Sequence, residues 1–399
     1  MKTLHHHFRK LLLPACTTIL LFAIFFASCK KDAVSTSAST PVKANTEQLT
    51  QAQASSDAHA YVNSTQRNVQ TQAAEINKQL VKAGFNAASA QTASLNAVKL
   101  NYSIYTIASH LPIFKSLTAA VNVTGLSAVL KDPSSTLTVF APTDYAFAQL
   151  PAPFNNANNI SHITDAAQIA TLKSILLYHV LGSEVSSQDI TKGRSSAETL
   201  KPQVAGNDNT LYFSKAYGVV GINGTSVVLL PNINANNGII HVISNVLAFP
   251  TATIASTAIA NADLSTLVAA LVKTNLADVF AGTGDYTVFA PTNEAFAKLP
   301  APFNNADNIN AITDATQIAT LANILKYHVL ARRYFGFDLG FFDEHTTLAD
   351  APNNKITTVT GYPAGYVKGN NNWGFSYINP GNILCTNGVV HVIPNVLMP

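Results

Sequence analysis

Charged side chains are scarce in this chain of 399 residues. Asp, Glu, Lys and Arg together make up 11% of it, whereas apolar residues make up 47%. Disordered chains usually show the opposite balance, so the composition predicts folded domains with real cores. The chain has 24 basic and 21 acidic residues, and three of the basic ones lie within the first ten positions. The remainder is formally neutral, which argues against nucleic acid as a partner.

Cysteine is almost absent as well. The three that occur are Cys16, Cys29 and Cys385. Cys16 lies in the N-terminal leader and Cys29 directly follows it at a candidate processing site, which leaves Cys385 without an intramolecular partner. This excludes a disulfide framework and a multi-cysteine metal cluster. Because Cys385 lies in an apolar, strand-like stretch, we expect a buried, unreactive thiol.

The usual signatures of catalysis are missing too. The sequence contains no Gly-x-Ser-x-Gly elbow, no glycine-rich phosphate loop, and no recurring Ser, His and Asp in a recognisable context. A metal site would need convergent ligands. His162, His179 and His241 are instead scattered, and the second half of the chain has Ala311 in place of His162. We therefore expect no enzyme activity, no metal and no cofactor.

An apolar run at the N-terminus indicates export. Three basic residues precede residues 11–27, which are uncharged and mostly apolar. This run is short for a transmembrane helix and is typical of a signal peptide. It ends in Ala27-Ser28-Cys29, which resembles a bacterial lipobox. The resemblance implies that residues 1–28 are removed and that Cys29 becomes an acylated N-terminus.

Acylation would anchor the protein stably in a membrane, because each buried methylene contributes about 0.8 kcal/mol. The following Lys30-Lys31-Asp32 resembles the charged export tag of some Bacteroidetes-type lipoproteins. We therefore expect an exported outer-membrane lipoprotein, and the tag favours exposure at the cell surface. An uncleaved signal anchor with an incidental cysteine is the alternative.

Two further segments precede the main body of the chain. Residues 29–58 are rich in Ser, Thr, Ala, Gln and Lys, which predicts a flexible tether. Residues 59–100 are predicted to form a helical spacer. Within it, Val69, Ala73 and Ile76 recur at the spacing of an amphipathic helix, whose packing partner the sequence does not identify.

The strongest signal is an internal repeat. Residues 138–181 and 287–330 align without a gap, and 34 of their 44 positions are identical. Residues 238–243 match residues 388–393 in the same way. A repeat of about 150 residues has the size of a complete domain rather than of a solenoid unit. We therefore predict two domains produced by duplication, at residues 101–249 and 250–399.

Each copy places its helical signals before most of its strand signals. Residues 136–140 form a short β-rich run, and residues 164–178 carry apolar side chains at helical spacing behind a Thr-Asp cap. From residue 199 to 247, short β-branched runs alternate with Asn-Gly turns, which are hairpin signals. This order predicts an α+β domain with a mainly antiparallel sheet.

Three ordered motifs in each copy resemble the fasciclin (FAS1) domain family. They are Thr-Val-Phe-Ala-Pro-Thr at 138–143 and 287–292, Tyr-His at 178–179 and 327–328, and Gly-x-x-His-Val-Ile at 238–243 and 388–393. The resemblance covers residues 101–399. It implies two tandem domains, each a wedge-shaped, mainly antiparallel β-sandwich with packed helices. It also implies adhesion or envelope interactions without a catalytic site.

The Tyr-His boxes are the first candidate binding residues. In animal members of the family this box has been linked to integrin contact. The resemblance therefore makes Tyr178, His179, Tyr327 and His328 candidates for binding a partner. Their apolar neighbours favour the alternative that both pairs are buried, with each histidine bonded to a nearby hydroxyl or carbonyl group.

The two copies differ most in the region after the second box. Residues 332–337 are rich in Arg and aromatic residues, whereas residues 182–187 are small and polar. The stretch from 333 to 377 carries the aromatic residues Tyr334, Phe335, Phe337, Phe341, Phe342, Tyr362, Tyr366, Trp373, Phe375 and Tyr377. Aromatic side chains on loops stack on sugar rings or fill partner pockets. We expect about half to complete the core, and Tyr362, Tyr366 and Trp373 to be exposed.

These features predict a lipid-anchored protein of the cell envelope that acts in adhesion. Its partners would be the membrane, through acylated Cys29, and an extracellular protein or polysaccharide. Two similar domains on one tether would gain affinity through effective concentration. The alternatives are a glycan-capturing accessory lipoprotein of an outer-membrane nutrient-uptake system and a structural envelope protein.

Overall fold

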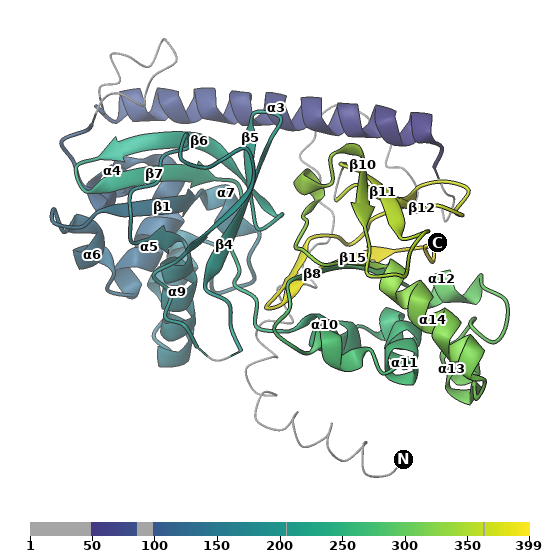
Figure 1. The fold of residues 1–399 in the computed structure, drawn as a ribbon. Helices are drawn as coiled ribbons and strands as arrows, with labels where there is room; N and C mark the ends of the chain where they lie inside the picture. Colours follow the sequence, from purple (N-terminus) through teal and green to yellow (C-terminus); the bar gives the residue numbers. More distant parts are fainter. Residues whose placement is uncertain (1–48, 86–98, 205, 362–363) are drawn as a thin grey trace.

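The computed structural model of the protein describes residues 49–85, 99–204, 206–361 and 364–399. One long helix, α3 (Gln51–Lys82), precedes two domains of matching element order (Figure 1). The predicted signal peptide, Cys29, the tether up to residue 48 and Tyr362 lie outside the described residues.

Domain 1 combines short helices with one seven-stranded sheet. The helices are α4 (Ile104–His110), η2 (Pro112–Phe114), α5 (Lys115–Val123), α6 (Ser127–Lys131), α7 (Asp144–Ala148), α8 (Ala157–Ser161) and α9 (Ala166–Tyr178). The strands are β1 (Leu137–Pro142), β2 (Val180–Leu181), β3 (Gly193–Glu198), β4 (Thr210–Ala216), β5 (Val219–Ile222), β6 (Ser226–Ala235) and β7 (Gly238–Ile243). Their order in the sheet is β2-β1-β7-β6-β5-β4-β3.

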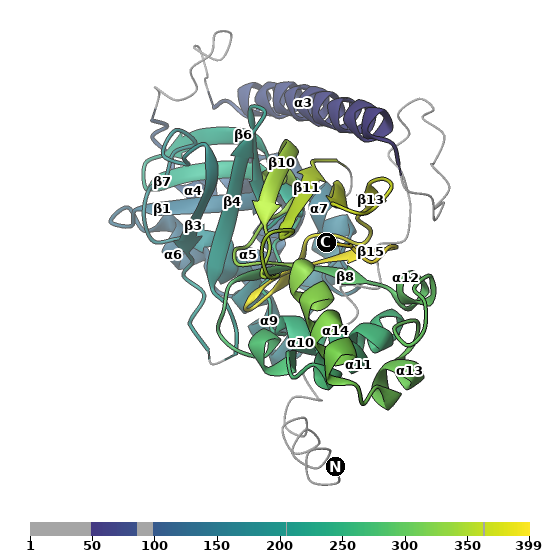
Figure 2. The ribbon, with the colours of Figure 1, turned by 45° about the vertical axis from the view of Figure 1, so that its right-hand side comes forward.

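Domain 2 repeats this plan with its strands divided between two sheets. The helices are α10 (Ile254–Ala260), η3 (Ala262–Leu264), α11 (Ser265–Lys273), η4 (Ala277–Phe280), α12 (Asn293–Ala297), α13 (Ala306–Ala311), α14 (Ala315–Tyr327) and η5 (Gly336–Asp338). The strands are β8 (Tyr286–Pro291), β9 (Val329–Leu330), β10 (Phe341–Thr346), β11 (Lys355–Val359), β12 (Tyr366–Gly369), β13 (Ser376–Tyr377), β14 (Ile383–Cys385) and β15 (Gly388–Ile393). The sheets run β10-β11-β12-β13 and β14-β15-β8-β9, with helices α10, α11, α13 and α14 gathered below them (Figure 2).

The centre of each domain is a parallel strand pair, β1 with β7 and β8 with β15, whereas the other pairings are antiparallel. Both faces of these strands are covered, so they are apolar almost throughout. Alternate side chains point to opposite faces. Val139 and Val242 join the core beneath the helices, whereas Phe140 and Ile243 join the core beneath the hairpin strands. The predicted α+β fold with two tandem domains is confirmed.

Helix α3 begins earlier than the sequence predicted. Thr50 caps it, because its hydroxyl accepts from the backbone N–H of Gln53 while the Gln53 side chain accepts from the N–H of Thr50. The predicted tether at 29–58 is therefore wrong at its C-terminal end. Ala54 and Ala58 are both completely buried, and this spacing of four places them on one face of the helix.

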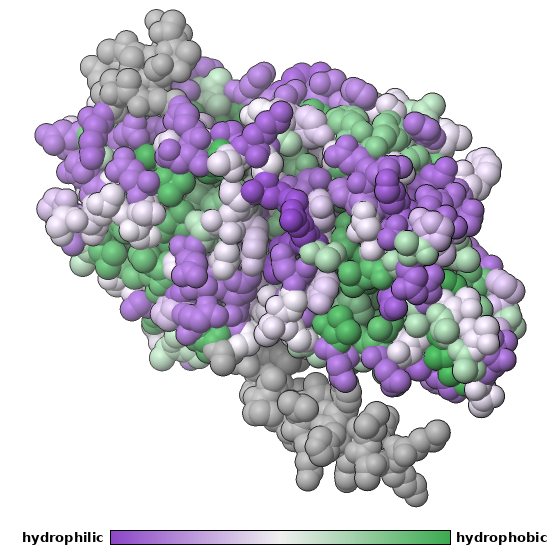
Figure 3. All heavy atoms as spheres, viewed as in Figure 1, coloured by the Kyte–Doolittle hydropathy of each residue, from purple (hydrophilic) through white to green (hydrophobic). Residues whose placement is uncertain are grey.

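Helix α3 packs against both domains. At its N-terminal end, Ala54 and Ala58 join a cluster with Phe375 of domain 2. At its C-terminal end, Ile76 and Leu80 belong to the core of domain 1. The helix therefore lies across the two domains, as Figure 1 shows, and its outer side is mostly hydrophilic (Figure 3).

Among the residues that the structure describes, no single helix is long and apolar enough to cross a membrane. One bent pair, Ile254–Ala260 with Ala262–Lys273, meets the length and composition jointly, with an angle of 107° between its helices.

Candidate interaction site

The Tyr-His box of domain 1 is buried where helix α9 ends. Tyr178 donates from its hydroxyl to the Thr210 carbonyl at 2.7 Å. His179 donates from Nδ1 to the Ile175 carbonyl at 2.7 Å, and its Nε2 accepts from the N–H of Leu247 at 2.8 Å. Both ring nitrogens are thus occupied by backbone groups, and only a neutral imidazole can make this pair of bonds.

Domain 2 repeats the arrangement. Tyr327 donates to the Lys355 carbonyl, while His328 bonds to Ile324 and Leu397 at 2.8 Å each. Tyr178, His179, Tyr327 and His328 are at most 2% exposed. The structure therefore agrees with the alternative in which both boxes are buried, and it offers no contact surface on these four side chains.

The histidine of the closing motif is held in a similar way. His241 donates from Nε2 to the Val185 carbonyl at 2.9 Å, and its Nδ1 accepts from the N–H of Asn232 at 3.2 Å. His391 makes the matching bonds in domain 2, to Tyr334 at 2.8 Å and Asn382 at 3.2 Å. Burial lowers the pKa of the box and closing-motif histidines from 6.5 to about 4.

Of the nine aromatic residues that the structure describes in the segment 333–377 of domain 2, four are buried and four are half-buried. Phe335, Phe337 and Phe375 are buried. Tyr366 is only 4% exposed and donates from its hydroxyl to Asp57 at 2.9 Å. The prediction that Tyr366 is exposed is wrong, because helix α3 covers it with residues such as Asp57, which lies 309 positions earlier in the chain. Tyr362 lies outside the described residues.

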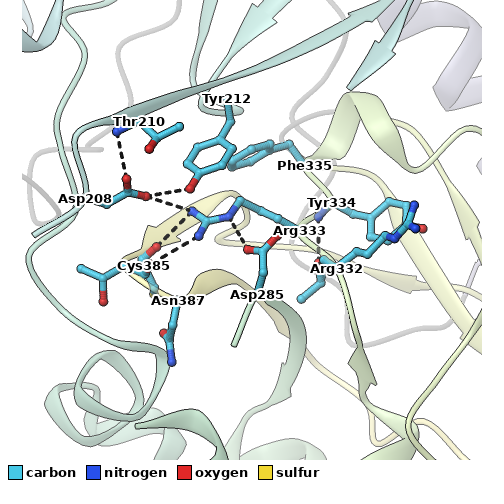
Figure 4. A network of polar contacts seen from close by, with 12 residues as sticks. Asp208, Thr210, Tyr212, Asp285, Arg332, Arg333, Tyr334, Phe335, Cys385 and Asn387 are labelled. Atoms are coloured by element: carbon cyan, nitrogen blue, oxygen red, sulfur yellow. Dashed lines mark hydrogen bonds and ion pairs between the residues drawn. The ribbon is translucent and has the colours of Figure 1, made fainter. Parts of the chain in front are cut away.

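Arg333 joins the two domains at the start of this segment. It is 6% exposed, and its guanidinium donates to the Asp285 carboxylate at 2.8 Å and to the Cys385 carbonyl at 3.1 Å (Figure 4). Domain 1 contributes the Asp208 carboxylate at 3.9 Å and the Tyr212 ring, whose centroid lies 4.0 Å from the guanidinium carbon. A buried charge needs such partners, and the planar guanidinium suits both carboxylates and an aromatic face.

Phe335 seals the junction against a turn of domain 1. At Gly224 in that turn φ is +69°, and a Cβ there would lie 2.5 Å from the Phe335 ring and 2.8 Å from the Asn382 side chain. Asn382 also donates from its side chain to the Gly224 carbonyl at 2.8 Å. Only glycine combines this backbone conformation with so close a contact.

The junction accounts for the divergence of the two copies. In domain 1 the backbone N–H of Ser186 donates to the Asp189 side chain, and in domain 2 the backbone N–H of Phe335 donates to the Asp338 side chain. Ser186 and Phe335 therefore occupy matching positions in the two domains. The residues of 332–337 that contact domain 1 are needed only in the copy that docks onto another domain, and they are Arg333, Tyr334, Phe335 and Phe337. The difference between residues 182–187 and 332–337 is visible in the sequence, but the sequence does not give its structural reason.

Trp373 is the exception among the aromatic residues that the structure describes in this segment, because 77% of it is exposed. It lies in the turn between β12 and β13, next to Asn370 and Asn371, which are also exposed. Of the three aromatic residues predicted to face solvent, Trp373 is the one that the structure places there. Within the described parts of the chain, no group of three or more His, Cys, Asp or Glu side chains is placed to hold a metal ion.

Comparison with known proteins agrees with the three motifs. The family model of the fasciclin domain matches residues 112–250 and 262–399. The chain belongs to the fasciclin domain family. It is 28% identical over 274 residues to the transforming growth factor-beta-induced protein ig-h3 of Sus scrofa, covering 68% of this chain and 35% of that protein.

Other relatives extend across kingdoms. A fasciclin-like arabinogalactan protein of Arthroderma benhamiae is 27% identical over 73% of this chain and 65% of its own length. Immunogenic protein MPB70 of Mycobacterium bovis is 35% identical over 35% of this chain and 65% of its own. The chain thus spans between about a third and two thirds of these relatives. A solved FAS1 domain pair from the insect cell adhesion molecule fasciclin I aligns with 71% of this chain and 97% of that chain, at 18% identity and a TM-score of 0.34.

The first FAS1 motif differs between the copies without a change of role. Asp144 accepts from the N–H of Ser116 at 2.7 Å, and Asn293 accepts from the N–H of Thr266 at 2.8 Å. A carboxylate and an amide oxygen serve equally well as this acceptor. The loss of the carboxylate in domain 2 is therefore explained by a structural function that an amide also performs.

The first FAS1 domain also contains an apolar pocket. It lies between α5, α6, α9 and β1, and its lining includes Leu117, Leu130, Leu177 and Leu200. The Asn237 side chain donates to the Leu130 carbonyl, and the Asn387 side chain of domain 2 donates to the Phe280 carbonyl in the same way. Phe280 therefore occupies the position in domain 2 that Leu130 occupies in domain 1. Domain 2 also has Lys326 where domain 1 has Leu177. The two domains therefore do not present the same surface here.

Proposed function

We propose that this protein is a lipid-anchored interaction protein of the cell envelope, which binds a protein or polysaccharide through its FAS1 pair. FAS1 domains are generally involved in adhesion and protein interactions. The observation that carries the proposal is Trp373, which is 77% exposed while Phe335, Phe337 and Phe375 of the same aromatic segment are buried. Exposed aromatic side chains are enriched at sites that bind a partner.

The rigid connection of the domains supports this proposal. The Arg333 junction and helix α3 both join domain 1 to domain 2. A pair fixed in this way presents its surfaces in one relative orientation, which lowers the entropy lost when both contact the same partner. We place the anchor at Cys29, outside the described residues, because of the lipobox resemblance.

The anchor is tested by metabolic labelling with a palmitate analogue. The native protein should incorporate the label and sediment with outer membranes, and the Cys29→Ala variant should lose both properties. An unlabelled native protein that still sediments with membranes would instead indicate an uncleaved signal anchor.

Adhesion is tested by deleting the gene and measuring cell aggregation and attachment to polysaccharide-coated surfaces. We expect both to decrease and to be restored by the native chain but not by Cys29→Ala. Unchanged aggregation and attachment would count against an adhesive role.

A further inference from the structure

The turn that carries Trp373 has a counterpart in domain 1. In domain 1, Ile222 pairs with Ser226, so three residues form the turn between β5 and β6. In domain 2, Val367 pairs with Ser376, so eight residues lie between the matching paired residues, and the first two of these eight extend β12. The two turns occupy the same place in the FAS1 fold, and the one in domain 2 is longer by five residues.

The shorter turn is a contact site within this chain. Gly224 at its centre is covered by Phe335 and Asn382 of domain 2. The longer turn belongs to the last domain of the pair and is not covered in this way, since Trp373 at its tip is 77% exposed. Leu49 and helix α3 cover Phe375 at the end of this turn, whereas the part of the turn that carries Trp373 is left open.

A second copy of this chain does not fit that open position. The face that covers the short turn depends on Phe335, and the matching residue of domain 1 is Ser186. The short turn of domain 1 needs Gly224 where it contacts domain 2, whereas the matching turn of domain 2 carries the bulky indole of Trp373. The domain-to-domain contact therefore cannot be continued from one chain to the next.

The Trp373 turn is held firmly by the FAS1 core. The Tyr327 hydroxyl accepts from the N–H of Asn370 at 2.9 Å. The Asn372 side chain accepts from the N–H of Met398 and donates to the Val396 carbonyl, each at 2.9 Å. The box tyrosine, itself buried, thus fixes the turn that displays the tryptophan. A preorganised turn loses little conformational entropy on binding.

We propose that the turn of residues 370–374 is a binding site for a neutral polysaccharide, with a sugar ring stacked on the Trp373 indole and its hydroxyls bonded to the exposed Asn370 amide, whereas the Asn371 amide donates to the Pro399 carbonyl. This proposal rests on the proposed binding function and specifies its ligand. Residues 370–375 carry no charge, and an indole face matches the apolar face of a pyranose ring. Side-chain amides supply both donors and acceptors, as sugar hydroxyls require.

Tryptophan fluorescence tests the site directly, because Trp373 is the single tryptophan of the chain. The probes are the hexasaccharides of cellulose, chitin, xylan, laminarin and mannan, each titrated into the acyl-free Cys29→Ala protein. We expect at least one of them to shift the emission to shorter wavelength in a saturable way and to protect it from acrylamide quenching. Phospholipid vesicles serve as a parallel probe, because indoles also favour membrane interfaces.

Substituted variants, measured by calorimetry, then show which residues bind the saccharide. Trp373→Ala should weaken the active saccharide by at least about tenfold, a loss of about 1.4 kcal/mol. Trp373→Phe should retain part of the affinity, and Asn370→Ala should weaken it less than Trp373→Ala does. Tyr145→Ala is the matched control, since Tyr145 is also an exposed aromatic residue, at 57%, but lies in domain 1. Unchanged urea midpoints would show that each variant is folded.

The outcomes separate this inference from the proposed function. If Trp373→Ala binds saccharides or cells as well as the native sequence does, the inference fails and the binding function stands. If the unsubstituted sequence binds neither, both fail. A fluorescence shift with vesicles and with no saccharide would overturn the polysaccharide site and assign the turn to membrane contact.

Discussion

Acidification should unfold this protein through four buried histidines. Each accepts one hydrogen bond from a backbone N–H and donates one to a backbone carbonyl, so protonation forces the accepted bond to break. Their pKa in the folded chain is about 4, against an ordinary value of 6.5. The residues are His179, His241, His328 and His391.

The sign follows from the depressed pKa. Between pH 6.5 and 4 the unfolded chain binds these protons and the folded chain does not, so stability is complete above pH 6.5 and falls as the pH decreases toward 4. At pH 5 the loss is about 2 kcal/mol for each histidine, or about 8 kcal/mol for the whole chain. Burial raises the pKa of Asp338 to about 6. Protonation of that carboxyl group therefore returns about 1 kcal/mol over the same range.

The remaining loss of about 7 kcal/mol is comparable to the total stability of a typical protein. Urea unfolding followed by far-ultraviolet circular dichroism should therefore show a steep fall in the free energy of unfolding between pH 7 and pH 5. His179→Gln should be less stable at pH 7 and should show a smaller pH slope. His162→Ala is the control, because His162 is exposed and domain 2 has Ala311 there. A change below about 1 kcal/mol between pH 7 and 5 would show that the four histidines do not stay neutral in the folded protein.

Three further predictions concern the junction and the thiol. Arg333→Ala should lower the free energy of unfolding by about 3 kcal/mol, because it removes the cation from a buried ion pair, whereas Arg332→Ala at the exposed neighbouring position should cost little in the same urea titration. Gly224→Ala should lower the free energy of unfolding by more than Gly125→Ala does. Both glycines have a positive φ, but an added Cβ at Gly125 has no atom within 4 Å. Equal effects of the two substitutions would contradict the tight contact at Gly224. Cys385 is fully buried with its pKa raised to about 11, so a maleimide should label it only in urea, and rapid labelling of the native protein would contradict that burial.

The repeat and its motifs were readable from the sequence because they record local requirements. The caps, the central apolar strands and the Tyr-His box depend on neighbours within one domain, and these recur in both copies. The burial of Cys385 also followed from its apolar surroundings.

The contacts between segments were not readable in the same way. Tyr366 looks like a loop aromatic in the sequence, yet Asp57 and helix α3 cover it. Arg333 has partners at Asp208 and Asp285, which no spacing rule connects with it. The difference between residues 182–187 and 332–337 was a visible signal of the junction. Its meaning required the docked geometry, because a pairwise difference does not say which partner a residue meets.

Binding of the acyl-free Cys29→Ala protein to intact cells tests most directly whether this protein binds an envelope partner. Fluorescently labelled protein would be titrated onto cells that lack the native gene, and the bound amount measured by flow cytometry. We expect saturable binding that unlabelled protein displaces and that Trp373→Ala reduces. Binding that is absent, or that neither saturates nor is displaced, would contradict the claim that this tandem FAS1 protein acts by binding an envelope partner.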